Sequence, residues 1–130
     1  MHTTTKSIPS ISNDGNNASY FDTHNIQLNG EEPWMLSEQQ AALNFRLRSS
    51  DAGYESDWHV AGDPTLLIIL AGVIEIELRD GSSMQFAKGD MFVAQDYLDN
   101  GIALSDALGH RARVIGGDML SALHLKLAKR

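Results

Sequence analysis

The chain is built from short segments in which apolar and polar residues alternate with a period of two. Segments 43–48, 73–79 and 120–127 follow this pattern. Side chains two residues apart lie on the same face of an extended strand, so the alternation predicts half-buried β-strands. Residues 65–70 place apolar side chains on both faces. That segment is therefore expected to be a strand that is covered on both sides.

Turn-forming residues separate these segments and indicate the fold class. Asp80-Gly81 predicts a tight hairpin, and Lys88-Gly89-Asp90 predicts a second tight turn. A single helical turn, capped by Ser37, is expected at residues 35–40. Further short strands are expected at residues 20–28, 84–86, 91–94 and 110–115. Many short strands joined by Gly-rich turns predict an all-β sandwich or barrel.

The N-terminal segment differs in composition from the rest of the chain. Residues 1–19 are rich in Ser, Thr, Asn and Gly and contain only isolated apolar residues, Ile8 and Ile11. Such a segment is expected to be a flexible arm that precedes one domain at residues 20–130. Deleting residues 1–17 is then expected to leave the fold intact.

Composition limits the classes of function. A chain of 130 residues with a net charge of −7 fits a single domain and argues against nucleic-acid binding. The longest apolar run is too short to cross a bilayer, and the N-terminus lacks an apolar signal core, so a cytoplasmic protein is expected. The absence of cysteine excludes disulfides, thiolate metal sites and a cysteine nucleophile. The doubly apolar strand at 65–70 favours a homodimer, because a small chain has few means to cover both faces.

The spacing of Gly53, His59 and Gly72 resembles the first motif of the cupin superfamily, G-x5-H-x-H-x3,4-E-x6-G. In this frame the second His of the motif falls on Ala61 and the Glu falls on Thr65. His110 stands at a ligand position of the second cupin motif. Within the superfamily, the sequences Trp58-His59, Asp80-Gly81, Gly89-Asp90 and Gly109-His110 are similar to those of a group of uncharacterised single-domain cupins. The resemblance covers residues 43–127 and implies a jelly-roll barrel, also called a double-stranded β-helix.

The resemblance also implies a small-molecule pocket near His59 and His110, with the loop at residues 96–109 over it. A substrate-binding protein of this kind is the favoured function, and no particular substrate is indicated. The candidate pocket residues are His59, His110, Asp96, Tyr97, Ala61 and Thr65.

Two catalytic alternatives stay open. The first is a metal-dependent dioxygenase or isomerase, with Fe, Mn, Ni or Zn held weakly by His59, His110 and either Asp57 or Asp96. The second is a metal-free acid/base isomerase that would use His59, the same carboxylates and Tyr97. This second arrangement resembles that of the sugar-nucleotide epimerases with the cupin fold.

Three further polar residues, Arg46, Arg48 and His124, are expected outside the pocket. Arg46 and Arg48 share one strand face, which is expected to meet solvent, although a polar barrel interior would let them clamp a carboxylate. His124 alternates with Leu123 and Leu125 and is expected at the surface or at an interface.

Overall fold

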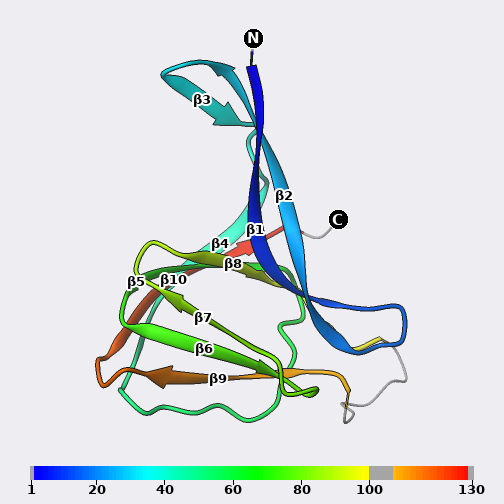
Figure 1. The fold of residues 1–130 in the computed structure, drawn as a ribbon, viewed down its shortest axis with the longest axis vertical. Helices are drawn as coiled ribbons and strands as arrows, with labels where there is room; N and C mark the ends of the chain where they lie inside the picture. Colours follow the sequence, from blue (N-terminus) through cyan, green and yellow to red (C-terminus); the bar gives the residue numbers. More distant parts are fainter. Residues whose placement is uncertain (1, 100–106, 129–130) are drawn as a thin grey trace.

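The computed structural model describes residues 2–99 and 107–128, and these residues form ten strands in two sheets (Figure 1). The larger sheet has the order β3-β2-β1-β8-β5-β10-β4, and the smaller has the order β7-β6-β9. The strands are β1 (His2–Asn13), β2 (Ser19–Glu31), β3 (Trp34–Ser37), β4 (Ala42–Ser50), β5 (Thr65–Ala71), β6 (Val73–Leu78), β7 (Ser83–Ala87), β8 (Met91–Ala94), β9 (His110–Ile115) and β10 (Leu120–Leu127). No helix that could span a membrane occurs among the described residues.

The two sheets pack face to face around one hydrophobic core, which confirms the predicted all-β class. The segment 65–70 carries apolar side chains on both faces, as expected: Leu67 and Ile69 point into the core, while Leu66 and Ile68 point outward and are half-buried. The core is completed by Ile11, Ile74, Ile76, Leu78, Phe86, Phe92, Ala94, Ala112, Val114, Leu120 and Ala122. The expected hairpin at Asp80-Gly81 joins β6 to β7.

Gly72 marks the point where the chain passes from the larger sheet to the smaller one. It lies between β5 and β6 and has a φ of 78°. A Cβ atom at this position would lie 2.5 Å from the backbone oxygen of Met119. Glycine is therefore required here both by the backbone conformation and by the close approach of a neighbouring strand.

The N-terminal segment is a paired strand and not the flexible arm that its composition suggests, so residues 1–17 are no longer expected to be dispensable for the fold. Residues 2–13 form β1, which pairs along its whole length with β2 and, at Ser10 and Ile11, in parallel with β8. Ile8 and Ile11 are only 3% and 1% exposed to solvent. Their odd spacing puts them on opposite faces of one strand, so they give no periodic signal although both are buried. Backbone hydrogen bonds to the neighbouring strands order the remaining polar residues of β1, and such bonds cannot be inferred from amino-acid composition.

The outer end of this hairpin projects away from the body of the molecule. Figure 1 shows β3, the start of β1 and the end of β2 extending beyond the other strands. Residues Trp34–Ser37 are a strand that pairs with β2, so the helical turn expected at 35–40 is wrong. The hydroxyl of Ser37 donates to the backbone oxygen of Glu38 instead of capping a helix. Trp34 and Leu36 on β3 are both exposed.

In strand β4 the apolar face points outward and the face that carries Arg48 points inward, which is the reverse of the expected orientation. It lies at the edge of the larger sheet, and its pairing with β10 sets Arg48 opposite Ala122 and Arg46 opposite His124. Ala122 is fully buried in the core, so Arg48 and His124 point to the inner side. Leu43, Phe45 and Leu47 point outward and are 59%, 67% and 71% exposed. Arg46 is exposed, as expected, but the expectation that Arg48 faces solvent is wrong. A period of two separates two faces without saying which is inside.

Candidate functional site

The structure brings His59 and His110 together. The segment before β5 forms an isolated antiparallel bridge with the start of β9, in which the backbone N–H of His59 donates to the oxygen of His110 at 2.9 Å. The reciprocal bond, from the N–H of His110 to the oxygen of His59, is 2.8 Å long. Their ring centroids lie 4.5 Å apart, with an angle of 56° between the planes.

Hydrogen bonds at Nδ1 determine which nitrogen of each imidazole carries a proton. Nδ1 of His110 lies 2.9 Å from Oδ2 of Asp96, and Nδ1 of His59 lies 2.8 Å from the backbone oxygen of Asp57. A carbonyl oxygen and an ionised carboxylate only accept hydrogen bonds, so both Nδ1 atoms are assigned as donors. In the neutral rings, each Nε2 then keeps a lone pair that is available to a ligand.

Asp96 supports His110 from behind. Its side chain is fully buried, its Oδ2 also accepts from the hydroxyl of Ser19 at 2.7 Å, and its Oδ1 accepts from the N–H of Ala61 at 2.9 Å. Burial raises the pKa of the Asp96 carboxyl, but the bonds and charge from His110, Ser19 and Ala61 outweigh it and lower this pKa overall. The ionised carboxylate thus orients His110 and ties β2 and the segment before β5 to the start of β9.

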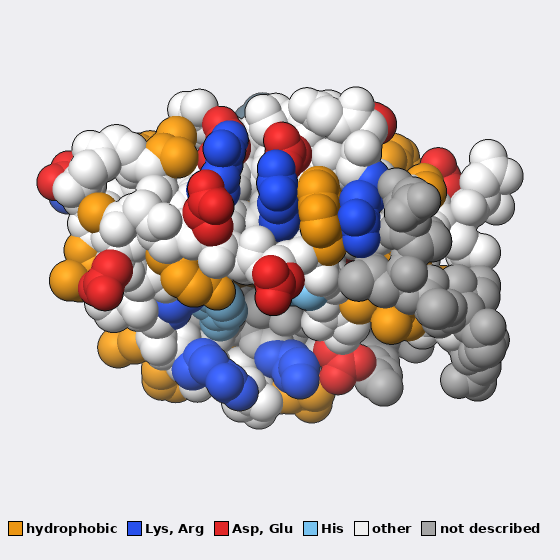
Figure 2. All heavy atoms as spheres, turned by 90° about the horizontal axis from the view of Figure 1, so that it is seen from below, with side chains coloured by type: hydrophobic (Ala, Val, Ile, Leu, Met, Phe, Trp, Pro, Cys, Tyr) orange, Lys and Arg blue, Asp and Glu red, His pale blue; other side chains and the backbone are white. Residues whose placement is uncertain are grey.

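A cavity of about 210 Å³ lies beside the two histidines, between the sheets. Ala61 and Thr65 contribute to its wall, as the sequence suggests. The remaining described lining residues are Arg48, His59, Val60, Leu67, Ile74, Ile76, Phe92, Ala94, His110, Ala112 and His124. Figure 2 shows a hollow at the centre of one face of the molecule, where histidine side chains lie between groups of Lys and Arg side chains.

Arg48 is a member of this site that the sequence interpretation placed in solvent. Its Nε donates to the hydroxyl of Ser50 at 2.9 Å, and its guanidinium lies 5.7 Å from the centroid of the Tyr54 ring. Burial lowers the pKa of Arg48. Among the described residues, no carboxylate forms an ion pair with it.

His124 is the second member that sequence reasoning missed. The expected surface or interface position is wrong, because its Nε2 atom is buried and has no hydrogen-bond partner among the described residues. Burial lowers the pKa of His124, and the charges of Arg48 and Arg46 lower it further. The signal was present in β10: Leu120, Ala122 and His124 share one face, and small or apolar residues at the first two positions indicate the inner side.

Other predicted pocket residues lie elsewhere. Tyr97 is 45% exposed and lines a separate surface hollow together with Asn13 and Pro64. The Asp57 side chain is exposed, and the backbone oxygen of this residue is what contacts His59. Half of the loop expected over the cavity, residues 100–106 of 96–109, lies outside the described residues.

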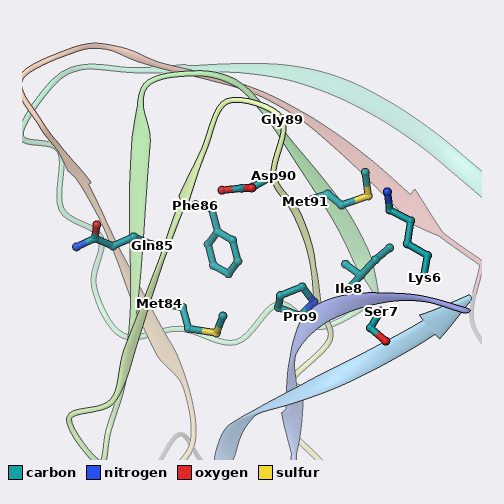
Figure 3. A pocket seen from close by; sticks show the side chains of 10 residues that line it. All are labelled: Lys6, Ser7, Ile8, Pro9, Met84, Gln85, Phe86, Gly89, Asp90 and Met91. Carbon is teal, nitrogen blue, oxygen red and sulfur yellow. The ribbon is translucent and has the colours of Figure 1, made fainter.

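A second cavity, of about 350 Å³, lies between β1 and the turn from β7 to β8 (Figure 3). Lys6 and Asp90 are the only charged residues among its described lining residues. The carboxylate of Asp90 already accepts a hydrogen bond from the N–H of Ala87 in the turn. None of its described lining residues is a histidine, so it lacks the imidazole groups of the cavity beside His59 and His110.

Comparison with known proteins identifies the fold. No protein-family model matches this chain, and no curated protein matches its sequence. Among solved structures, the cupin domain of Cnp3 from Schizosaccharomyces pombe matches 95% of this chain and 88% of its own, at 13% identity and a TM-score of 0.50. The chain has the cupin fold. The resemblance carried by Gly53, His59 and Gly72 is therefore confirmed at the level of the fold.

Two further solved structures are similar over much of the chain. A cupin 2 conserved barrel domain protein from Rhodopseudomonas palustris matches 97% of this chain and 73% of its own, at 16% identity and a TM-score of 0.49. The conserved protein SPY1581 of unknown function from Streptococcus pyogenes matches 77% of this chain and 79% of its own, at 20% identity and a TM-score of 0.47. At such low identity a cupin fold says nothing about substrate, so function must be argued from the site itself.

The residues of this chain do not fit the metal centre that the cupin fold suggests. No group of three or more His, Asp or Glu side chains in the described part of the chain is placed to hold a metal ion. Ala61 and Thr65 stand where the motif has its other ligands, and Asp96 is already bonded to His110, Ser19 and Ala61. Two imidazoles without a carboxylate make an incomplete ligand set.

Proposed function

We propose that this cupin binds a small molecule in the cavity beside His59 and His110. The observation that supports the proposal most strongly is the pair of imidazoles whose Nδ1 atoms are engaged by Asp57 and Asp96, so that both Nε2 atoms are available. A concave, mostly apolar cavity with a few convergent polar groups is the usual form of a ligand site. His59 is exposed and gives the cavity a polar entrance.

Filling the cavity is expected to abolish ligand binding. Ala61 lines the cavity and is only half-buried, so Ala61→Phe places a ring in the space at little cost to folding. Fragments that bind the wild-type protein, detected by fluorine NMR line broadening, should no longer bind this variant. The matched control is Ala41→Phe, which adds the same ring at an exposed position. Fragments that bind Ala61→Phe as well as the wild type would place the ligand site elsewhere.

The two catalytic alternatives stay predictions, and the site supports them unequally. A metal-dependent dioxygenase or isomerase would need a carboxylate beside the two histidines, and no described Asp or Glu is free to supply it there. An acid/base isomerase has a candidate base in His110, which Asp96 orients in the manner of a catalytic dyad. Tyr97, the expected acid, lines a different hollow, so this alternative has no acid partner among the residues foreseen for it.

We also propose that the chain forms a homodimer through the outer face of the larger sheet. The register places Phe45, Leu125 and Leu66 in one row across β4, β10 and β5. Leu47, Leu123 and Ile68 form the next row. Monomeric proteins rarely expose contiguous apolar patches of this kind.

The partner that best fits this surface is a second copy of the same chain. The projecting β2–β3 hairpin carries the exposed apolar side chains of Trp34 and Leu36, so one chain offers both an apolar face and an apolar extension. Under two-fold symmetry the hairpin of each copy can lie on the sheet face of the other, which buries both surfaces twice. The same arrangement covers the free edge of β4, which is a site of aggregation when left open.

Phe45→Glu is expected to convert the dimer to a monomer without unfolding the chain. The new carboxylate would have to lose its hydration in an apolar interface, whereas in the monomer it stays in water. Light scattering should give twice the chain mass for the wild type and the chain mass for the variant. Leu98→Glu introduces the same charge at another exposed apolar position and should remain dimeric. A wild-type chain that is monomeric at micromolar concentration would contradict the proposal.

A further inference from the structure

We propose that the ligand of the histidine cavity is a monocarboxylate with a small apolar body, and that its carboxylate pairs with Arg48. This inference rests on the proposed function and specifies the chemical class of the ligand. Three features of the cavity wall lead to it: a basic residue without a counter-ion, a polar atom without a partner, and an apolar remainder of limited size.

The charge of the cavity is carried by one residue. Among the described lining residues, Arg48 alone carries a permanent charge, and none of them is Asp or Glu. Its hydrogen bond to Ser50 and its position over the Tyr54 ring hold the guanidinium in one orientation. A partly desolvated guanidinium without an anionic partner is unfavourable, and a carboxylate matches its fork of N–H donors.

His124 supplies the second polar contact. Its buried Nε2 atom has no partner among the described residues, and unsatisfied polar atoms are uncommon in folded interiors. Arg48 on β4 lies opposite Ala122 on β10, and His124 follows two positions after Ala122 on the same inner face. Side chains in this diagonal relation lie within reach of one ligand group. A carboxylate held by Arg48 can therefore accept a hydrogen bond from His124.

The rest of the wall selects the body of the ligand. Most of it is formed by the apolar residues Val60, Ala61, Leu67, Ile74, Ile76, Phe92, Ala94 and Ala112. Apolar cavities of about 150 Å³ bind benzene in an engineered protein. The present cavity, at about 210 Å³, has room for a six-membered ring or a short alkyl chain with one carboxylate attached. The other polar residues of the described lining, the histidines and Thr65, carry no permanent positive charge that would neutralise a second carboxylate, so a monoanion fits better than a dianion.

Benzoate and benzamide provide a direct test, because they share a ring and differ in charge. The titration is performed by calorimetry on the full chain in low-chloride buffer at neutral pH. Benzoate is expected to bind roughly tenfold to a hundredfold more tightly than benzamide, the range typical of a charge-assisted bond. In Arg48→Met, benzoate should bind no more tightly than benzamide. Lys88→Met removes an equal charge at an exposed turn and should leave both affinities unchanged.

The melting temperature of the ligand-free protein gives a second test that does not depend on benzoate or benzamide. Arg48→Met removes a cation that has no anionic partner, so the ligand-free variant should melt at the wild-type temperature or above it. Arg48→Lys keeps the charge but loses the fork, and it should bind benzoate with intermediate affinity.

The outcomes separate this inference from the proposal on which it rests. Equal binding of benzoate and benzamide, with both lost in Ala61→Phe, would overturn the monocarboxylate inference and leave the cavity as a ligand site. Preferential benzoate binding that survives Arg48→Met would also overturn it, since the anion would then be held elsewhere. Failure of both probes to bind wild-type protein would count against the cavity itself as well as against the ligand class.

Discussion

Removing residues 1–17 is expected to abolish the cooperative unfolding transition of this protein. The deletion takes away β1, which pairs with β2 along its length and with β8 at Ser10 and Ile11. It also removes the buried side chains of Ile8 and Ile11, each of which contributes about 1.5–3 kcal/mol through burial. The lost burial and ladder bonds together are comparable with the whole stability of a small domain, about 5–15 kcal/mol. Thermal unfolding followed by circular dichroism and calorimetry measures the effect.

A shorter deletion and a point variant sharpen this experiment. Residues 2–6 are exposed, so deleting residues 1–6 should leave a cooperative transition. Ile11→Ala keeps the ladder and leaves a cavity in the core, which should lower the free energy of unfolding by about 2–5 kcal/mol. If the longer deletion melts cooperatively near the wild-type temperature, the N-terminal segment is dispensable and its contacts with the core contribute little.

Asp96→Ala is expected to lower the free energy of unfolding by about 3 kcal/mol. The substitution leaves three donors unsatisfied in a buried place: the imidazole of His110, the hydroxyl of Ser19 and the N–H of Ala61. These donors belong to separate segments, so the loss also loosens the position of His110 relative to the cavity. Chemical denaturation at neutral pH measures the change, and fragment binding to the variant should weaken in parallel.

The same carboxylate predicts how stability depends on pH. Folding lowers the pKa of Asp96 below its unfolded value of 3.8. The contribution of this group to stability is therefore fully present above pH 3.8 and is lost as the pH falls through the lower folded-state pKa. The difference in stability between wild type and Asp96→Ala should shrink over that acid range. Asp118→Ala, at an exposed turn, should follow the wild-type profile. A difference that stays constant with pH would show that the charge of Asp96 is not what stabilises the fold.

Local patterns in the sequence determined most of the strands and the fold class. The alternation at 73–79 and 120–127, the apolar run at 65–70 and the Asp80-Gly81 turn depend on residues that are close in the chain. A strand period and a turn are local properties, so each could be recognised without knowing its neighbours. The frame of Gly53, His59 and Gly72 extended this to the fold, because Gly72 is required where β5 passes into β6.

Tertiary structure decided which face of each strand is inside and which side chains meet. Arg48 enters the cavity because β4 pairs with β10 in a register that sets Arg48 opposite Ala122. Nothing local distinguishes that arrangement from the reverse one, since the outward apolar face of β4 carries the same alternation. Asp96 became a support for His110, and Tyr97 was directed away, through hydrogen bonds to Ser19, Ala61 and Asn13 that join distant segments. β1 was ordered by its pairing with β2 and β8, and ladder bonds of this kind depend on backbone partners that the sequence of the segment does not reveal.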